Sequence, residues 1–299
     1  MKDVDRVYSI SSDSLNVSAS ILGGALTSVK DAKGIEYLWQ GNKTYWSGTA
    51  PILFPICGSI RNNRATIGSS KHTIMPRHGI VRKRKWKLES ISNSTMTFLF
   101  ASDDVSRDAF PYDFILHATY LVEGKTVEFV LEVENSNDIK MPFFVGGHPG
   151  FNCPLMSGEV YNDYYLEFER EEDCTSPISI SETGLVDMAH RVKILSNTRY
   201  LELSHKLFYK DMVILDELKS RKVSLRSHKS DVGIALNFKE FPYLILWSSP
   251  NGGPFIALEP WLGLSTCSDE DDIFEHKRNV QILAPHAKKK YRFSIHVLG

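Results

Sequence analysis

The feature that most constrains the fold is an alternation of apolar and polar residues with a period of two. In 126–134 apolar side chains occupy every second position, with acidic residues between most of them, and the same pattern recurs at 232–238 and 291–297. Successive side chains of a β-strand point to opposite faces, so each segment predicts a strand with one buried face.

Turn-forming residues separate these segments at intervals of roughly ten residues, as in proteins built only from short strands. Only Asp271–Lys277 has a weakly helical pattern. We therefore predict an all-β fold, a large antiparallel β-sandwich. No linker, composition shift or repeat interrupts the chain, so we expect one domain over residues 1–299. The turn signals are Asn42-Lys43, Asn62-Asn63, Glu123-Gly124, Asn135-Ser136-Asn137, Ser157-Gly158, Thr183-Gly184 and Asn251-Gly252-Gly253.

Composition excludes several classes of protein. The chain has 299 residues, 42% hydrophobic and 24% charged, with a net charge of −1. These values are ordinary for a globular protein and give no electrostatic reason to expect nucleic acid or an anionic membrane as partner. The opening Met-Lys-Asp-Val-Asp-Arg carries no apolar signal segment, and no 18-residue apolar run follows.

The four cysteines are widely spaced and form no Cys-x-x-Cys pair, which favours reduced thiols over a disulfide framework or a structural zinc site. Together with the missing signal segment, this predicts a cytoplasmic protein. The cysteines are Cys57, Cys153, Cys174 and Cys267.

One histidine stands in an unusual setting. His148 follows the apolar run 141–145 and lies in the segment Gly-Gly-His-Pro-Gly-Phe-Asn of 146–152. A histidine at a turn is most often simply hydrogen-bonded there. The flanking glycines, however, predict open space beside the imidazole ring, and Asn152 is placed to orient a ligand or the loop.

Two further segments present polar groups in a similar way. His78 lies in a basic loop between Arg77 and Arg82, and Glu259 directly follows the apolar residues 255–258 and precedes Pro260-Trp261. A carboxylate in that position must leave the buried strand or be buried with a partner. A solvated loop and an edge glutamate paired with lysine are the simpler alternatives. Taken together, the three residues predict an acid/base site.

The sequence contains no motif that would indicate another common type of functional site. Dinucleotide-binding, P-loop and nucleophile-elbow motifs are missing, and no spacing of ligands typical of a metal site occurs. The basic run 82–87 is more typical of a solvated edge strand than of a nucleic-acid surface. The acidic run 269–272 lacks the spaced ligands and the glycine of a calcium loop.

These segments, in this order, resemble the aldose 1-epimerase family, the galactose mutarotase-like proteins, and most of all its LacX-like bacterial subgroup. In the classical form of the motif around His148, an aromatic residue follows His-Pro, whereas this chain has Gly150 there. The resemblance extends over nearly the whole chain through the Gly23-Gly24 turn of 17–30, residues 37–41 with Trp46, residues 51–58 ahead of Arg61, His-Gly-x-x-Arg at 78–82, Gly-His-Pro-x-Phe-Asn at 147–152 and Glu-Pro-Trp at 259–261.

The resemblance implies the family's sandwich fold and interconversion of the α and β anomers of a free hexose without a cofactor. It assigns Glu259 as base toward the C1 hydroxyl and His148 as acid toward the ring oxygen. Mutual attraction would then raise the pKa of the histidine and lower that of the glutamate. His78, Arg61, Asn152 and Asp211 are the expected sugar contacts.

Three alternatives remain open. A sugar-binding protein on the same fold would not need a matched acid and base. A glycosidase would need two presented carboxylates, whereas only Glu259 stands out. Within mutarotases, a hexose 6-phosphate could be bound by arginines and Lys206. The sequence leaves the sugar open, and equally whether the protein is a monomer or a homodimer.

Overall fold

The computed structural model describes residues 6–68 and 70–299, apart from the side chains of 70–72. The expectation about a signal segment falls partly on residues 1–5, which lie outside this range. Within the described residues, no helix is long and apolar enough to cross a membrane.

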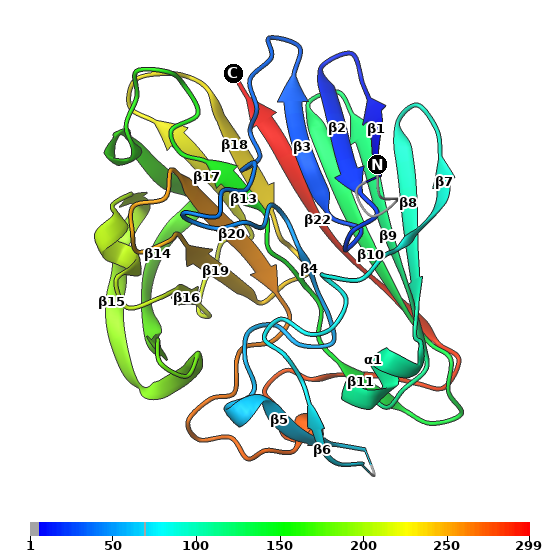
Figure 1. Ribbon diagram of the computed structural model, residues 1–299. Helices are drawn as coiled ribbons and strands as arrows, with labels where there is room; N and C mark the ends of the chain where they lie inside the picture. Colours follow the sequence, from blue (N-terminus) through cyan, green and yellow to red (C-terminus); the bar gives the residue numbers. More distant parts are fainter. Residues whose placement is uncertain (1–5, 69) are drawn as a thin grey trace.

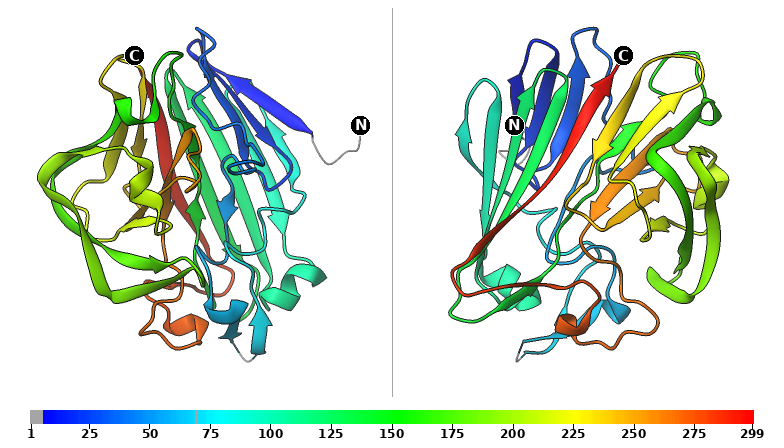
Figure 2. Two further views of the ribbon diagram at one scale, coloured as in Figure 1. Left: turned by 60° about the vertical axis from the view of Figure 1, so that its left-hand side comes forward. Right: turned by 180° about the vertical axis from the view of Figure 1, so that it is seen from behind.

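The largest sheet of the described residues has nine strands, each antiparallel to its neighbours, and it forms one wall of the molecule (Figure 1). Its β14–β15 end curls around the strands of a second sheet (Figure 2). The strand order is β15 (Leu185–Glu202), β14 (Tyr164–Ile180), β17 (Lys222–Ser227), β18 (Gly233–Asn237), β22 (Lys288–Leu298), β10 (Thr126–Asn135), β9 (Phe114–Glu123), β8 (Thr95–Ala101) and β7 (Lys87–Ile91).

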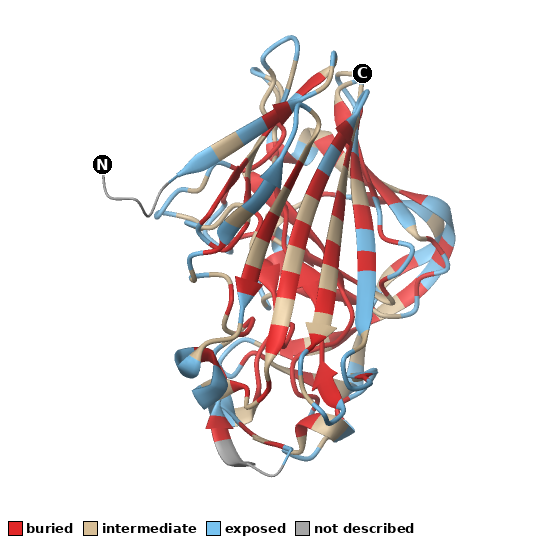
Figure 3. Cartoon of the chain, turned by 90° about the vertical axis from the view of Figure 1, so that its right-hand side faces the viewer, coloured by how far each residue is buried: buried red, intermediate tan, exposed pale blue. Residues whose placement is uncertain are grey.

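The segments in which apolar and polar residues alternate are strands of this sheet. Residues 126–134, 232–238 and 291–297 lie mainly in β10, β18 and β22. Along β10, buried residues alternate with half-buried ones from end to end, and Figure 3 shows such banding along the long strands. The buried face of the sheet, with side chains such as Phe98 and Tyr120, packs into the core of the sandwich.

A second sheet of six strands lies inside the curve of the first. Its central strand β20 is buried at every position, because neighbouring strands and the larger sheet cover it. The strands are β16 (Val213–Leu215), β19 (Tyr243–Trp247), β20 (Phe255–Trp261), β12 (Gly146–Gly147) and β4 (Ile52–Leu53), with β13 (Gly150–Asn152) also paired to β20.

Three smaller sheets complete the described structure. The antiparallel all-β sandwich confirms the predicted fold class. One of the smaller sheets, formed by β1, β2 and β3, packs on the nine-stranded sheet through the contact of Tyr8 with Phe98. The remaining strands are β1 (Val7–Ser11), β2 (Leu15–Ser20) and β3 (Leu26–Asp31) in one sheet, β11 (Met141–Phe143) with β21 (Gln281–Leu283), and β5 (Arg64–Ile67) with β6 (Ser70–Ile74).

Helical structure is minor, and the sequence located it poorly. The weak helix expected over 271–277 is only a 3₁₀ turn, η4 (Phe274–His276). The α-helix α1 (Asp104–Ala109) was not expected, although Asp103 caps it by accepting a hydrogen bond from the Ser106 backbone N–H at 2.9 Å. The other 3₁₀ turns are η1 (Arg61–Asn63), η2 (Tyr161–Asp163) and η3 (His205–Phe208).

Candidate active site

A cavity of about 200 Å³ opens beside β20. It is smaller than the roughly 300–1,000 Å³ typical of pockets for drug-sized ligands, so it has room only for a smaller molecule. His78, His148 and Glu259, which the sequence singled out separately, all line it, as does Asp211, which only the family resemblance suggested. The other lining residues are Trp46, Pro51, Arg77, Arg82, Met212, Trp247 and Trp261.

His148 is held between β12 and β13. Its backbone N–H donates to the carbonyl oxygen of Pro51 at 3.1 Å. The glycines around it do not leave open space for a ligand, as the sequence had suggested. A Cβ at Gly146 would come within 2.9 Å of the Cys57 sulfur and of Trp261, and one at Gly147 would come within 2.6 Å of Phe293. These glycines therefore let protein side chains pack behind the histidine.

Glu259 and His148 form a buried pair. The Oε2 atom of Glu259 lies 3.3 Å from Nε2 of His148 and accepts a hydrogen bond from the Trp261 indole N–H at 3.1 Å. Glu259 is 1% exposed and His148 6%. Glu259 thus has a buried partner, one of the two outcomes expected for it. Pro260 and Trp261 continue β20.

Burial sets the protonation of this pair. It lowers the pKa of His148 to about 3, with Arg77 and Arg82 adding to the effect, and it raises the pKa of Glu259 well above 4.5. The expected mutual attraction would have moved both values the other way. Desolvation outweighs it, because a charge in this dry site loses its hydration. Over the intermediate pH range the pair therefore holds one proton, which rests on Glu259.

His78 sits in a strained turn, with φ of 65°. Its backbone N–H donates to the Gly58 carbonyl oxygen at 2.7 Å, and the Gly58 N–H donates to its Nδ1 at 3.2 Å. Nε2 lies 3.3 Å from Nε of Arg77, at the distance of a hydrogen bond in which Arg77 donates. A neutral imidazole accepts at only one nitrogen, so His78 accepts from one of two competing donors, the Gly58 N–H or the Arg77 Nε–H.

Asp211 reaches the cavity from the turn after η3, where its φ is 81°. Its carboxylate accepts a hydrogen bond from the Ser179 hydroxyl at 3.0 Å and lies 3.6 Å from the guanidinium of Arg77. The Arg77 contact is too long for a strong hydrogen bond. Arg77 can therefore turn toward a ligand without breaking a strong hydrogen bond to Asp211.

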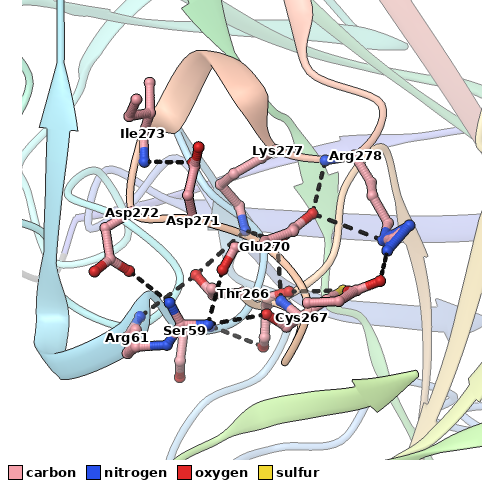
Figure 4. Close-up of polar contacts among 12 residues, drawn as sticks. Ser59, Arg61, Thr266, Cys267, Glu270, Asp271, Asp272, Ile273, Lys277 and Arg278 are labelled. Carbon is pink, nitrogen blue, oxygen red and sulfur yellow. Dashed lines mark hydrogen bonds and ion pairs between the residues drawn. The ribbon is translucent and has the colours of Figure 1, made fainter. Parts of the chain in front are cut away.

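Arg61 does not line the cavity, which corrects the expected sugar contact. Its guanidinium pairs with Asp272 at 2.9 Å and donates to the carbonyl oxygens of Cys267 and Glu270, each at 3.1 Å (Figure 4). Glu270 also forms a buried ion pair with Lys277 at 3.0 Å. Arg61 is thus used to hold the loop that follows β20, and Arg77 and Arg82 are the arginines of the cavity.

Asn152 also lies outside the cavity lining. Its side-chain amide donates to the carbonyl oxygen of Glu36 at 2.8 Å. The sequence offered two uses for Asn152, orienting a ligand or orienting the loop. In the structure Asn152 orients the loop.

Two tryptophans form an aromatic wall of the cavity. Trp46 stacks on His148 with ring centroids 4.7 Å apart, and Trp247 meets the same imidazole edge-on at 5.8 Å. Trp46 appeared in the sequence only as part of the family resemblance, and Trp247 was missed. Trp247 could have been recognised as a tryptophan at the end of a strand, just before the turn at 248–253. The faces of aromatic rings such as these two are apolar and suit the C–H groups of a sugar ring.

No group of three or more His, Cys, Asp or Glu in the described residues could hold a metal ion. A larger surface groove of about 610 Å³ lies between 239–242 and 289–291. It contains no histidine, and Glu240 is its one carboxylate among the described lining residues. Unlike the smaller cavity, this groove therefore brings no histidine together with a carboxylate among its described lining residues.

Comparison with known proteins decides the family. The sequence profile described as aldose 1-epimerase matches residues 6–270. The chain belongs to the aldose 1-epimerase family. It is 45% identical over 290 residues to the plasmid-encoded protein LacX of Lactococcus lactis subsp. lactis, covering 95% of this chain and 97% of that protein.

Solved structures agree with this family assignment. A galactose mutarotase related enzyme from Lactobacillus acidophilus superimposes with a TM-score of 0.92 at 29% identity, over 98% of this chain and 97% of that one. A galactose mutarotase-like protein from Lactobacillus casei gives 0.90 at 28%, over 98% and 100%. The recognition of the family and of its LacX-like subgroup from sequence motifs is thereby confirmed.

Proposed function

We propose that this member of the aldose 1-epimerase family interconverts the α and β anomers of an aldose by acid/base catalysis. The observation that carries the proposal is the buried contact of 3.3 Å between His148 Nε2 and Glu259 Oε2, in a cavity of about 200 Å³. A single proton held between a nitrogen and a carboxylate is what the reaction needs, since one group must accept a proton while the other donates one.

In the forward direction, Glu259 as carboxylate takes the proton of the C1 hydroxyl and His148 as imidazolium protonates the ring oxygen. The C1–O5 bond breaks, and C1 becomes an aldehyde. Rotation about C1–C2 turns the other face of the carbonyl toward the O5 hydroxyl. His148 then takes the O5 proton back as O5 attacks C1, and Glu259 returns a proton to O1. No electrons leave the sugar, so the chemistry needs no cofactor.

The resting pair carries its proton on Glu259, so the active arrangement requires transfer of that proton to His148. The two atoms lie 3.3 Å apart, so a slight approach brings them within the reach of about 2.6–3.2 Å for direct transfer. Sugar hydroxyls that enter the cavity would replace part of the hydration lost on burial and so favour the ionised pair. The positive charge of Arg77 favours the carboxylate form of Glu259 as well.

The remaining groups orient the sugar. When a ligand draws the Arg77 Nε–H away from His78, Nδ1 keeps the Gly58 N–H and the imidazole presents Nε2–H to a ring or hydroxyl oxygen. Asp211 and Arg77, loosely paired at 3.6 Å, offer an acceptor and a donor for neighbouring hydroxyls. A well-placed acid or base contributes roughly 10²- to 10⁴-fold, which suffices for a reaction that already occurs slowly in water.

Two other functions fit the same cavity less well. A carbohydrate-binding protein would not need a carboxyl group and an imidazole buried in contact with each other in its cavity. A glycosidase would use two carboxylates as its acid/base pair, whereas the group in contact with Glu259 is a histidine.

Polarimetry distinguishes these functions. Freshly dissolved single anomers of several hexoses and hexose 6-phosphates should reach equilibrium rotation faster with the protein than without it. Binding of hexoses without acceleration would favour the carbohydrate-binding protein. Cleavage of aryl glycosides would favour the glycosidase.

A further inference from the structure

Trp261 holds one of the two oxygens of the Glu259 carboxyl group. The two residues are two positions apart on β20, so their side chains lie on the same face of the strand. The indole N–H of Trp261 donates to Oε2 at 3.1 Å, and Nε2 of His148 lies 3.3 Å from the same oxygen. Among the described residues, no hydrogen bond or ion pair reaches Oε1. One carboxyl oxygen is therefore engaged by the protein, and the other is left for a ligand.

The indole of Trp261 is fixed from two sides. Its side chain is buried, and its ring meets the imidazole of His78 edge-on with centroids 5.6 Å apart. On β12, a Cβ at Gly146 would lie 2.9 Å from Cδ1 of Trp261, so the glycine lets the indole lie against that strand. An indole N–H can only donate. Trp261 thus presents to Glu259 a donor that is already oriented before a reaction begins.

We propose that Trp261 is a positioning residue that divides the work between the two oxygens of Glu259. Oε2, held by Trp261, passes its proton to Nε2 of His148, and Oε1 then takes the proton of the C1 hydroxyl. On ring closure, Oε1 returns a proton to O1 while His148 takes the proton of the O5 hydroxyl. The inference rests on the proposed mutarotation and adds the residue that prepares its base.

The hydrogen bond from Trp261 favours the form of the pair that reacts. A hydrogen bond to a carboxylate is roughly twice as strong as one to a neutral carboxyl group. Trp261 therefore stabilises the state in which Glu259 is ionised and His148 carries the proton, and it opposes the effect of burial, which raises the pKa of Glu259. Without this N–H, a smaller fraction of the protein is ready to react.

Trp261→Phe tests this role, because it removes the N–H and keeps an aromatic ring beside His78. By polarimetry, kcat should fall by roughly 10-fold, the difference between a charged and a neutral hydrogen bond, while calorimetric binding of the sugar changes less. In the pH profile of kcat, the alkaline limb marks deprotonation of Glu259 and should move up by about one pH unit. The acidic limb marks protonation of His148 with Glu259 already neutral, so it should stay in place.

The two expected changes have one cause, the lost stabilisation of the carboxylate, so they should agree in size. A tenfold smaller population of the ionised pair corresponds to a shift of about one pH unit in the deprotonation of Glu259. Loss of packing alone would lower kcat without moving one limb.

A second replacement separates the N–H from the shape of the side chain. Benzothienylalanine at position 261 keeps the bicyclic ring and has sulfur in place of the N–H, so it should give the same fall in kcat and the same shift even if Trp261→Phe folds poorly. Trp86→Phe is the matched control. Trp86 is equally buried, its N–H donates to the carbonyl oxygen of Val81 at 3.2 Å, and it lies outside the cavity lining. It should keep kcat and both limbs.

The other ionisable groups around Glu259 are the same in all these proteins, so they do not account for a shift of one limb. They are His148 before β13, Arg77, His78 and Arg82 between β6 and β7, Asp211 after η3 and the buried thiol of Cys57 after β4.

Each failure has a distinct reading. If the wild-type protein accelerates anomerisation and both replacements of Trp261 keep its kcat and its alkaline limb, the inference is overturned and mutarotation stands. A fall in kcat without movement of the alkaline limb would also overturn it, because that result marks a loss of packing. A wild-type protein that accelerates anomerisation of no sugar overturns the proposed mutarotation, and the role of Trp261 with it.

Discussion

The indole of Trp46 lies nearly flat against the imidazole of His148, with ring centroids 4.7 Å apart and planes 26° from parallel. Gly150 makes this contact possible, because a Cβ at that position would lie 2.7 Å from the Trp46 ring. The glycine that replaces the aromatic residue of the classical family motif thus makes room for a tryptophan from another loop. Gly150 and Trp46 together give His148 its aromatic neighbour.

Gly150→Ala should disturb the site through Trp46. The added methyl group must push the indole away, and His148 would then lose the ring that fixes its orientation. We expect kcat/KM for anomerisation to fall by roughly 10- to 100-fold, as for small misplacements of a catalytic group. Trp46→Leu should cause a similar loss. A Gly150→Ala protein with unchanged kcat/KM would show that the stacking does not position His148.

The ionisation of His148 can be followed by NMR. Because burial lowers its pKa to about 3, its imidazole should remain neutral at pH 5, where histidines of unfolded chains, with a pKa near 6.5, are mostly protonated. A His148→Asn variant assigns the resonance. Protonation of His148 with a midpoint near 6.5 in the free protein would contradict the burial argument.

The pH profile of the rate should be bell-shaped, since the active pair holds one proton. The acidic limb then marks protonation of His148 and the alkaline limb marks deprotonation of Glu259. This order is the reverse of the one that the sequence alone suggests. An alkaline limb set by His148 would contradict the assignment.

Glu259→Gln should change how stability depends on pH. The folded-state pKa of Glu259 is raised above 4.5, so its contribution to stability is full below 4.5 and is lost as pH rises through the folded value. Gln has no such dependence. The free energy of unfolding of the variant should therefore increase relative to wild type between pH 4.5 and 8, as measured in urea. Glu182→Gln, at an exposed turn, should show a constant difference, and a flat difference for Glu259→Gln would contradict the raised pKa.

Activity should not depend on a metal ion. The mechanism uses only protons of His148, Glu259 and the sugar, so dialysis against EDTA should leave kcat unchanged. Loss of activity that a divalent cation restores would require a different mechanism.

The sequence predicted the fold and the main residues of the cavity because both leave local signals. Period-two alternation identified β10, β18 and β22, and the short motifs around His78, His148 and Glu259 identified groups that the structure brings together. Asp211 rested only on the resemblance, yet it lines the same cavity.

Long-range geometry explains what the sequence did not predict. Arg61 was expected to contact the sugar because a family-like segment precedes it. Its guanidinium instead forms hydrogen bonds and an ion pair with the loop 266–272. Trp247 reaches the cavity only because β19 pairs with β20. The protonation of His148 and Glu259 depends on burial, which outweighs their attraction and which no spacing in the sequence reveals.

The most direct test of the central claim is the anomerisation rate of Glu259→Gln, measured by polarimetry beside wild type and Glu182→Gln. The amide keeps the shape of the carboxylate but cannot accept the C1 hydroxyl proton, so kcat should fall by at least about 10²-fold while sugar binding changes less. His148→Asn should lose a similar factor. The account predicts that Glu182→Gln behaves as wild type, and a Glu259→Gln protein that equilibrates anomers at the wild-type rate would contradict it.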